Sequence, residues 1–533
     1  MQQQQQNRTA GTATTTSAKH SSLRDISRRL SATSFASSSS TSASPRHVKQ
    51  WLAVALCFSL VAVATLQLMS QVSVPSTLHF LRPAEWSAAN EAADEGKACL
   101  SRDRPLLASV SQPPTCEPCL LDPADPLCVY GAANIRLSRA YEGSGDRVRK
   151  VLAKALRGEQ VRIGVLGSSV SAGHGILTTL EARWQWRFLG NFQKRFPKTE
   201  IFDGSSPGMN SEFFSYCYSA IVPDDLDLYL IELDLNNEFL PETYKMDDNL
   251  MRGLLDLPQR PAVIRMQVFA LWFSDMVRGA ASSIMTSQWL DVPVITVRNW
   301  LAPQSLLHPE EAHQYFSKDA AGVVDWRHMS EESHHGLSDM LSLYLKEQLC
   351  RVERAEKFPE LEPRADSIWP KRDVLETVPR QYLWQAYDKQ FQVPPVRPKC
   401  MLSSANLTAL TGSQHKLGSN WQKIEWNDKQ AYQSASVGSR VTFEWTGTQV
   451  GLFVWTSNGA GALTKPGKAW CFIDQNFSSG KEIDAFVDRA AAGPIWHVVA
   501  DSVAYGTHTV TCQIMATSST AGHDFRIIGL ASL

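Results

Sequence analysis

The chain has 533 residues and a formal net charge of -1, with 43% hydrophobic and 20% charged residues. This length exceeds that of one compact domain, so we expect at least two domains. The balanced charge argues against nucleic acid as a partner, and the ordinary composition excludes disorder of the whole chain.

The N-terminal 70 residues predict a tail followed by a membrane anchor. Residues 1–50 are rich in Gln, Ser and Thr and too poor in apolar side chains to form a core, which predicts a disordered tail. Residues 51–70 are apolar, and no Asp, Glu, Lys or Arg lies between Lys49 and Arg82. About 20 apolar residues span a hydrocarbon core as a helix. The segment starts too late for a cleaved signal peptide, so it predicts a transmembrane signal anchor.

The charges around this anchor predict its orientation. Only Arg82 follows the anchor closely. The basic residues shortly before it are Arg24, Arg28, Arg29, Arg46 and Lys49. The positive-inside rule therefore keeps the tail cytosolic and places everything after the anchor in a lumen or outside the cell. We expect a single-pass type II membrane protein of the Golgi, the wider secretory pathway or the cell surface.

An oxidising compartment changes how the cysteines are interpreted. The nine cysteines beyond the anchor are Cys99, Cys116, Cys119, Cys128, Cys217, Cys350, Cys400, Cys471 and Cys512. Disulfides are favoured there over a zinc site at Cys116, Cys119 and Cys128. The odd number leaves one thiol free or paired between chains, and Cys471 and Cys512 are candidates for a bond because both lie in strand-like runs. Asn406-Leu-Thr and Asn476-Phe-Ser are glycosylation acceptors.

The part beyond the anchor divides into four segments. We expect a lumenal stem at 71–145, an α/β domain at 146–355, a Pro-rich linker at 356–399 and an all-β sandwich at 400–533. In the α/β domain, strand-like runs alternate with amphipathic segments, which is typical of a parallel sheet between helices. The expected strands are Val161–Leu166, Leu228–Leu233, Ala262–Phe269 and Val292–Val297, and the expected helices are 180–195 and 338–354.

The C-terminal segment has short alternating runs between turn residues, which favours a sandwich. Its clearest strands are 441–445, 450–455, 509–514 and 525–530. Trp445, Trp455 and Trp470 could stack on sugar rings, although tryptophan on alternating strands more often fills a core.

Two motifs in the α/β domain indicate nucleophilic chemistry. The first strand runs into Gly167-Ser168-Ser169, which places a serine at the carboxyl edge of the sheet, where α/β proteins bind ligands. Near the end of the domain, Asp325-Trp-Arg-His328 brings a carboxylate and an imidazole to a spacing that suits an oriented general base. Each motif alone is weak, because small residues and Asp-x-x-His are common in turns.

Two further segments complete a pattern. Gly208 lies in a Gly-rich turn after a strand, and Asn236 and Asn237 end another strand. In this order the four elements resemble the conserved blocks of the SGNH (GDSL-type) hydrolase superfamily over roughly 200 residues. The resemblance implies a flavodoxin-like three-layer fold without a cofactor or metal.

The resemblance also implies a role for each block. Ser169 would be the nucleophile, His328 the base and Asp325 its orienting group, and the oxyanion hole would comprise the N–H groups of Ser169 and Gly208 and the side chain of Asn236. The chain departs from the family at Ser168, where Asp is usual, and at Asp234, where block three usually has Gly.

Other site interpretations fit less well. An ordinary α/β-hydrolase elbow would need Gly at Ser171. A metal site at Asp325, His328, His334 and His335 would leave the other blocks unexplained.

The function expected from these motifs is ester chemistry on glycans. An anchored serine esterase acting on O-acyl, preferably O-acetyl, esters of glycans or on a small ester fits the compartment and the accessory sandwich. A polysaccharide O-acetyltransferase with the same three residues and a non-catalytic glycan-binding scaffold are the alternatives. The sequence makes no prediction of the oligomeric state.

Overall fold

The structure is a computed structural model. It describes residues 115–176, 178–361, 368–369, 377–394, 397–410, 420–426, 428–460, 464–489 and 492–533. The expected tail (1–50), the expected anchor (51–70) and residues 71–114 of the expected stem lie outside the described residues. Within the described ranges, no helix has both the length and the apolar character needed to cross a membrane.

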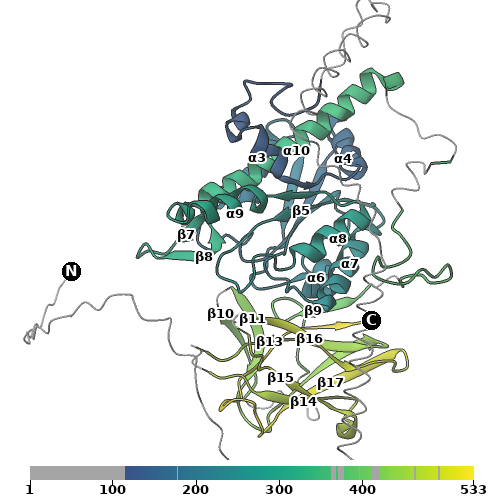
Figure 1. Cartoon of the computed structure of the whole chain (residues 1–533). Coiled ribbons are helices and arrows are strands. Elements are labelled where there is room, and N and C mark those ends of the chain that lie inside the picture. Colours follow the sequence, from purple (N-terminus) through teal and green to yellow (C-terminus); the bar gives the residue numbers. More distant parts are fainter. Residues whose placement is uncertain are drawn as a thin grey trace, which may run out of the picture. The chain divides into compact units, whose positions relative to one another are not determined.

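A six-stranded sheet forms the centre of the α/β domain (Figure 1). Its strands are β1 (Arg139–Tyr141), β2 (Val161–Gly167), β3 (Thr199–Asp203), β4 (Leu228–Glu232), β5 (Ala262–Gln267) and β6 (Val294–Thr296). They lie in the order β1-β6-β5-β4-β2-β3, in which β3-β2-β4-β5-β6 are parallel and form the expected flavodoxin-like arrangement. The edge strand β1 is antiparallel to β6, so the sheet is mixed, which corrects the expectation of an all-parallel sheet.

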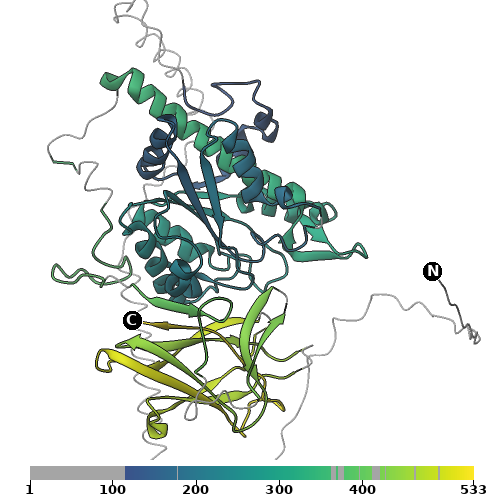
Figure 2. The same ribbon diagram turned by 180° about the vertical axis from the view of Figure 1, so that it is seen from behind.

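Helices cover both faces of this sheet (Figures 1 and 2), which confirms the three layers. The helices packed on one face are α4 (Asp146–Leu156), α5 (Trp184–Gln193), α9 (Arg298–Leu307) and α10 (Glu331–Lys357). Those on the other face are α6 (Ser211–Cys217), α7 (Pro241–Leu255) and α8 (Ala280–Leu290). Strands β4 and β5 are buried along their whole length because they are covered on both sides, which explains their nearly continuous apolar runs.

Part of the segment assigned to the stem belongs to the α/β domain. Helix α3 (Ala132–Leu137) leads into β1, and Ile135 lies in the apolar core. Cys116 forms a disulfide with Cys350 of α10, and Cys119 forms one with Cys128. These thiols are therefore bonded in pairs and are not metal ligands. In the described part of the chain, no group of three or more His, Cys, Asp or Glu residues could hold a metal ion.

The C-terminal domain is built from two sheets. One has the order β10-β11-β18-β13-β16, with β9 pairing β18, and the other has the order β12-β17-β14-β15. The first sheet comprises β9 (Lys399–Leu402), β10 (Gln422–Trp426), β11 (Lys429–Ser434), β13 (Val450–Thr456), β16 (Gly493–Ala500) and β18 (Phe525–Ser532). The second comprises β12 (Arg440–Gly447), β14 (Lys468–Ile473), β15 (Lys481–Asp484) and β17 (Gly506–Ile514). Cys471 and Cys512 are directly paired across β14 and β17 and form the expected disulfide.

One sheet of this domain packs against the α/β domain. Along β13, Leu452 and Val454 face the sandwich core, whereas Phe453 between them belongs to a core shared with α6. The ring of Phe453 lies 5.2 Å from that of Phe213, and a disulfide joins Cys217 at the end of α6 to Cys400 in β9. Burial on both faces explains why β13 is apolar at nearly every position rather than at alternate ones.

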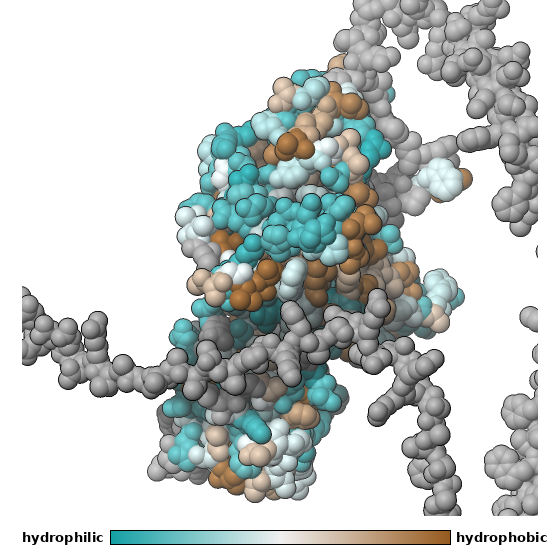
Figure 3. Space-filling view, turned by 60° about the vertical axis from the view of Figure 1, so that its left-hand side comes forward, coloured by the Kyte–Doolittle hydropathy of each residue, from teal (hydrophilic) through white to brown (hydrophobic). Residues whose placement is uncertain are grey.

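The protein surface is mixed in character. Figure 3 shows one face, on which a broad hydrophilic area lies beside a band of hydrophobic side chains. Trp272 and Phe239 of the α/β domain are among the large apolar side chains that remain exposed, at 43% and 53% respectively.

Candidate active site

The serine predicted as nucleophile lies on the turn that follows β2. The first residues of this turn pack closely, since a Cβ at Gly167 would overlap the side chain of Ser171. Ser168 is buried, whereas Ser169 is half-buried. The Ser169 Oγ lies 2.9 Å from the Nε2 of His328. The structure thus joins two residues that are 159 positions apart in the sequence.

The predicted base and its orienting carboxylate lie on one strand. Asp325 and His328 are part of β8 (Val324–Met329), which pairs with β7 (Phe316–Lys318). The Nδ1 of His328 lies 2.6 Å from the Oδ2 of Asp325. Because a carboxylate only accepts, Nδ1 carries the hydrogen, and the lone pair of Nε2 is left to accept the Ser169 hydroxyl. A relay of this geometry can activate a serine hydroxyl for attack.

Arg327 contacts the triad carboxylate and was not identified from the sequence. Its Nε donates to the Oδ1 of Asp325 at 3.0 Å, and its guanidinium carbon lies 5.3 Å from the centre of the Trp272 ring. Although partial burial opposes the shift, hydrogen bonds from Arg327 and His328 lower the pKa of Asp325 to about 2. The carboxylate therefore remains ionised whenever the imidazole acts as a base.

Burial is the main cause that lowers the pKa of His328, and the charge of Arg327 acts in the same direction against the opposing effect of Asp325. The imidazole should thus lose its proton, and become able to act as a base, at a lower pH than an unperturbed histidine does. We predict that kcat/KM for an ester substrate rises with pH through an apparent pKa below 6.5, the value for an unperturbed histidine.

The charge of Arg327 lowers the pKa of His328, so Arg327→Gln should raise this pKa. The rise of kcat/KM with pH (the acid limb of the profile) should then move to higher pH by roughly 0.5 unit, as expected for a half-exposed charge. A pH–rate profile of both proteins is the measurement. Arg440→Gln, at an exposed position at the start of β12, is the matched control. An acid limb that stays in place or moves to lower pH in Arg327→Gln would refute this role of the guanidinium.

The three predicted oxyanion donors differ in their present partners. Among the described residues, neither the backbone N–H of Ser169 nor the side chain of Asn236 has a hydrogen-bond partner. The N–H of Gly208, in contrast, donates to the Oγ of Ser168 at 3.0 Å. Ser168 stands where the resembled family usually has Asp, and its hydroxyl thus accepts a hydrogen bond from Gly208, one of the three predicted oxyanion donors. The N–H of Ser169 and the side chain of Asn236 are thus not bonded to any described residue, whereas the N–H of Gly208 is held by Ser168 beside the nucleophile.

A buried carboxylate supports the nucleophile turn and was also missed. Glu232 ends β4 next to Gly167, and one of its oxygens accepts from the Oγ and N–H of Ser171 at 2.9 and 3.2 Å and from the N–H of Ser168 at 3.3 Å. Complete burial raises its pKa to about 7. An acidic residue within the apolar run Leu228–Leu233 is the sequence signal that could have identified it.

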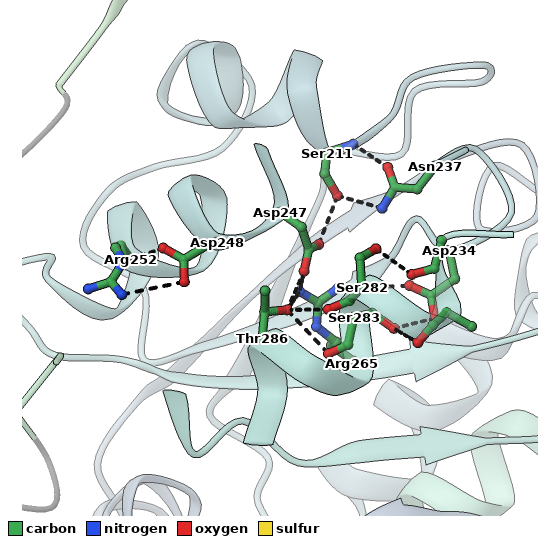
Figure 4. Close-up of polar contacts among 12 residues, drawn as sticks. Ser211, Asp234, Asn237, Asp247, Asp248, Arg252, Arg265, Ser282, Ser283 and Thr286 are labelled. Carbon is green, nitrogen blue, oxygen red and sulfur yellow. Dashed lines mark hydrogen bonds and ion pairs between the residues drawn. The ribbon is translucent and has the colours of Figure 1, made fainter. Parts of the chain in front are cut away.

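A second buried network anchors the loop after β4. Arg265 of β5 donates to Asp247 at 2.5 Å and lies 3.8 Å from Asp234, and Asp247 accepts from Ser211 at 3.2 Å (Figure 4). The side chain of Asn237 accepts from the N–H of Ser211 and donates to its Oγ, each at 2.9 Å. Asn237 is therefore held within this network, whereas the side chain of Asn236 takes no part in it.

The two histidines of the alternative metal site have partners outside this relay. His334 is fully buried, and its Nδ1 accepts from the N–H of Trp184 at 3.2 Å. His335 pairs instead with Glu331. His174, however, lies close to the triad, with its ring centre 5.2 Å from that of His328.

Comparisons with known proteins show the fold. No protein-family model matches this chain, and no curated protein matches it. A solved two-domain esterase (CEX) active on acetylated mannans covers 75% of this chain and 98% of its own, with 14% identity and a TM-score of 0.50. The same esterase co-crystallized with mannopentaose gives the same coverage and identity and a TM-score of 0.51. The chain therefore shares a two-domain fold with this esterase, consisting of an α/β domain and a C-terminal β domain.

Proposed function

We propose that this protein is a serine esterase that removes O-acyl groups, preferably O-acetyl groups, from glycans. The observation that carries the proposal is the continuous relay from Ser169 through His328 to Asp325, at 2.9 and 2.6 Å. The shared fold with an esterase active on acetylated mannans supports the substrate class.

The first half-reaction follows from this geometry. The Oγ of Ser169 attacks the ester carbonyl carbon while its proton passes to the Nε2 of His328, and Asp325 stabilises the imidazolium. The carbonyl oxygen becomes an oxyanion near the Ser169 N–H and the Asn236 amide. When the C–O bond to the sugar breaks, the imidazolium returns the proton to the leaving sugar hydroxyl, and the acyl group remains on Ser169.

In the second half-reaction, water attacks the acyl carbon while His328 accepts a proton from it. The imidazolium then returns this proton to the Oγ of Ser169 as the acyl C–O bond breaks and the carboxylic acid is released. A sugar hydroxyl in place of water would give a transferase with the same residues. The ratio of the two rates, measured with an acetyl donor in the presence and absence of an unacetylated oligosaccharide, distinguishes these reactions.

The test of the proposal uses a fluorophosphonate probe and two substrates. The wild-type chain should be labelled and should release acetate from p-nitrophenyl acetate and from an acetylated manno-oligosaccharide, whereas Ser169→Ala should do neither. A folded chain that is not labelled and releases no acetate, yet binds oligosaccharide, would establish the scaffold alternative instead.

We further propose that the site lies on the lumenal or extracellular side of a membrane. The apolar segment at 51–70, the basic residues before it and the four disulfides within the described residues support this location.

Asn406 and Asn476 are both exposed and should carry glycans when the full chain is made in eukaryotic cells. Endoglycosidase treatment should then increase gel mobility, and the Asn406→Gln/Asn476→Gln variant should show no shift. Digestion of residues 115–533 by protease added to sealed microsomes would show that the orientation is reversed.

A further inference from the structure

The hairpin of β10 and β11 brings two charged side chains of the β domain to the candidate active site. Asp428 directly precedes β11, and Lys429 is its first residue. The Oδ2 of Asp428 lies 3.7 Å from the Nε2 of His174, the histidine beside the catalytic His328. This contact places an exposed carboxylate of the β domain two side chains away from the nucleophile.

Lys429 approaches the site from the oxyanion side. Its Cε lies 3.5 Å, and the ring of Trp455 3.1 Å, from the position that a Cβ on Gly208 would occupy. The ammonium group lies 5.4 Å from the centre of the Trp455 ring. Because the N–H of Gly208 is bonded to Ser168, Lys429 and Trp455 lie against the turn next to the nucleophile. The same hairpin thus places Asp428 beside the neighbour of His328 and Lys429 beside the turn next to the nucleophile.

The junction between the domains holds this hairpin in place. The rings of Tyr216 and Trp496 stack with their centres 4.4 Å apart, and Arg489 donates to Glu238 at 2.6 Å across the same junction. The disulfide between Cys217 and Cys400 ties the two domains covalently. A shared apolar core and a covalent link make the position of the hairpin a fixed property of the fold rather than a transient contact.

The groups presented there are those that recognise a sugar. A carboxylate accepts hydrogen bonds from neighbouring sugar hydroxyls, and an ammonium group donates to them. Asp428 is well suited to this role because its side chain is 80% exposed and its contact with His174, at 3.7 Å, is longer than a hydrogen bond. A small ester such as p-nitrophenyl acetate has no hydroxyl for either group to bind.

We propose that Asp428 and Lys429 bind hydroxyl groups of the sugar ring that carries the acyl group, so that the β domain selects a glycan ester over a simple ester. This inference rests on the proposed esterase function and assigns its substrate recognition to two residues outside the α/β domain. The site is formed only when both domains are present.

The test compares two substrates in the full chain. In Asp428→Asn and in Lys429→Met, kcat/KM for an acetylated manno-oligosaccharide should fall roughly 10- to 100-fold, as expected for the loss of hydrogen bonds to charged groups. For p-nitrophenyl acetate the decrease should be less than about threefold. Lys429→Arg, which keeps the charge and the donors, should recover a large part of the oligosaccharide activity. Asp501→Asn and Lys481→Met, at exposed positions of the same domain, are the matched controls.

A second measurement does not depend on turnover. Mannopentaose binding to Ser169→Ala should be weakened by adding Asp428→Asn. Equal losses on both substrates, or unchanged oligosaccharide kinetics and binding in Asp428→Asn, would overturn the inference. If the wild-type chain cleaves neither substrate, the proposed function fails. Weaker mannopentaose binding in the double variant would still support the sugar site in that case.

Discussion

Replacing Ser169 by Ala is expected to lower kcat for p-nitrophenyl acetate and for acetylated oligosaccharide by roughly 10⁴- to 10⁶-fold, with little change in stability. Ser169 supplies the atom that bonds to the acyl carbon, and no other hydroxyl among the described residues is bonded to the Nε2 of His328. His328→Ala should cause a loss of similar size, because a serine hydroxyl is a poor nucleophile without a base to take its proton.

The double variant provides the sharper result. Since Ser169 and His328 act as a unit, removing both should be little worse than removing either one. Ser168→Ala is the matched control, because this neighbouring hydroxyl accepts from Gly208 and not from the triad. Its kcat should fall less than about tenfold. Additive losses in the double variant, or an Ser169→Ala enzyme with substantial turnover, would contradict the relay. Stopped assays of acetate release over long incubations reach the required sensitivity.

Replacing Arg265 by Met is expected to lower the free energy of unfolding by about 3–5 kcal/mol. The guanidinium is 1% exposed and lies between Asp247, which is fully buried, and Asp234, which is nearly so. Methionine fills a similar volume but leaves both carboxylates without their counter-charge. The network in Figure 4 would then lose the group that connects β5 to α7 and to the loop that carries Asn236.

Urea unfolding and the midpoint of thermal unfolding measure this loss. Arg440→Met, at an exposed position, should change the unfolding free energy by less than about 0.5 kcal/mol. Adding Asp247→Leu to Arg265→Met should recover part of the stability, because one of the two uncompensated charges is then removed. A single variant as stable as the wild type would show that the buried ion pairs do not hold this loop.

The local pattern of the sequence was sufficient to predict most of the sheet and the turn motifs. Apolar runs located both ends of β2, β4, β5 and β6 within two residues. The largest differences are at the end of β5, which is Gln267 and not Phe269, and at the start of β6, which is Val294 and not Val292. The expected helix at 338–354 is longer, because Ser330 caps α10 and its apolar face continues to Val352. Apolar side chains recur at a spacing that is characteristic of each type of element, so the sequence of a single strand or helix is enough to predict it.

The tryptophans of the sandwich show where such a pattern stops being informative. Trp445 is buried in the core of the β domain, as the interpretation as a core residue predicted. Trp455 lies on β13, which is apolar at nearly every position, and its ring packs on Gly208. The continuous apolar pattern of β13 indicates burial on both faces, but it does not show that the α/β domain covers the second face.

By itself, the sequence determined the types of residues available for chemistry and their places at strand ends, because the carboxyl edge of a parallel sheet follows directly from where each strand stops. It also indicated the three layers and the separate β domain. Only the tertiary structure decided that Arg327 contacts the triad carboxylate, that Glu232 supports the nucleophile turn, and that Asp428 and Lys429 reach the site from the other domain. These contacts join residues through packing between elements, and a single sequence carries no periodic signal for such contacts.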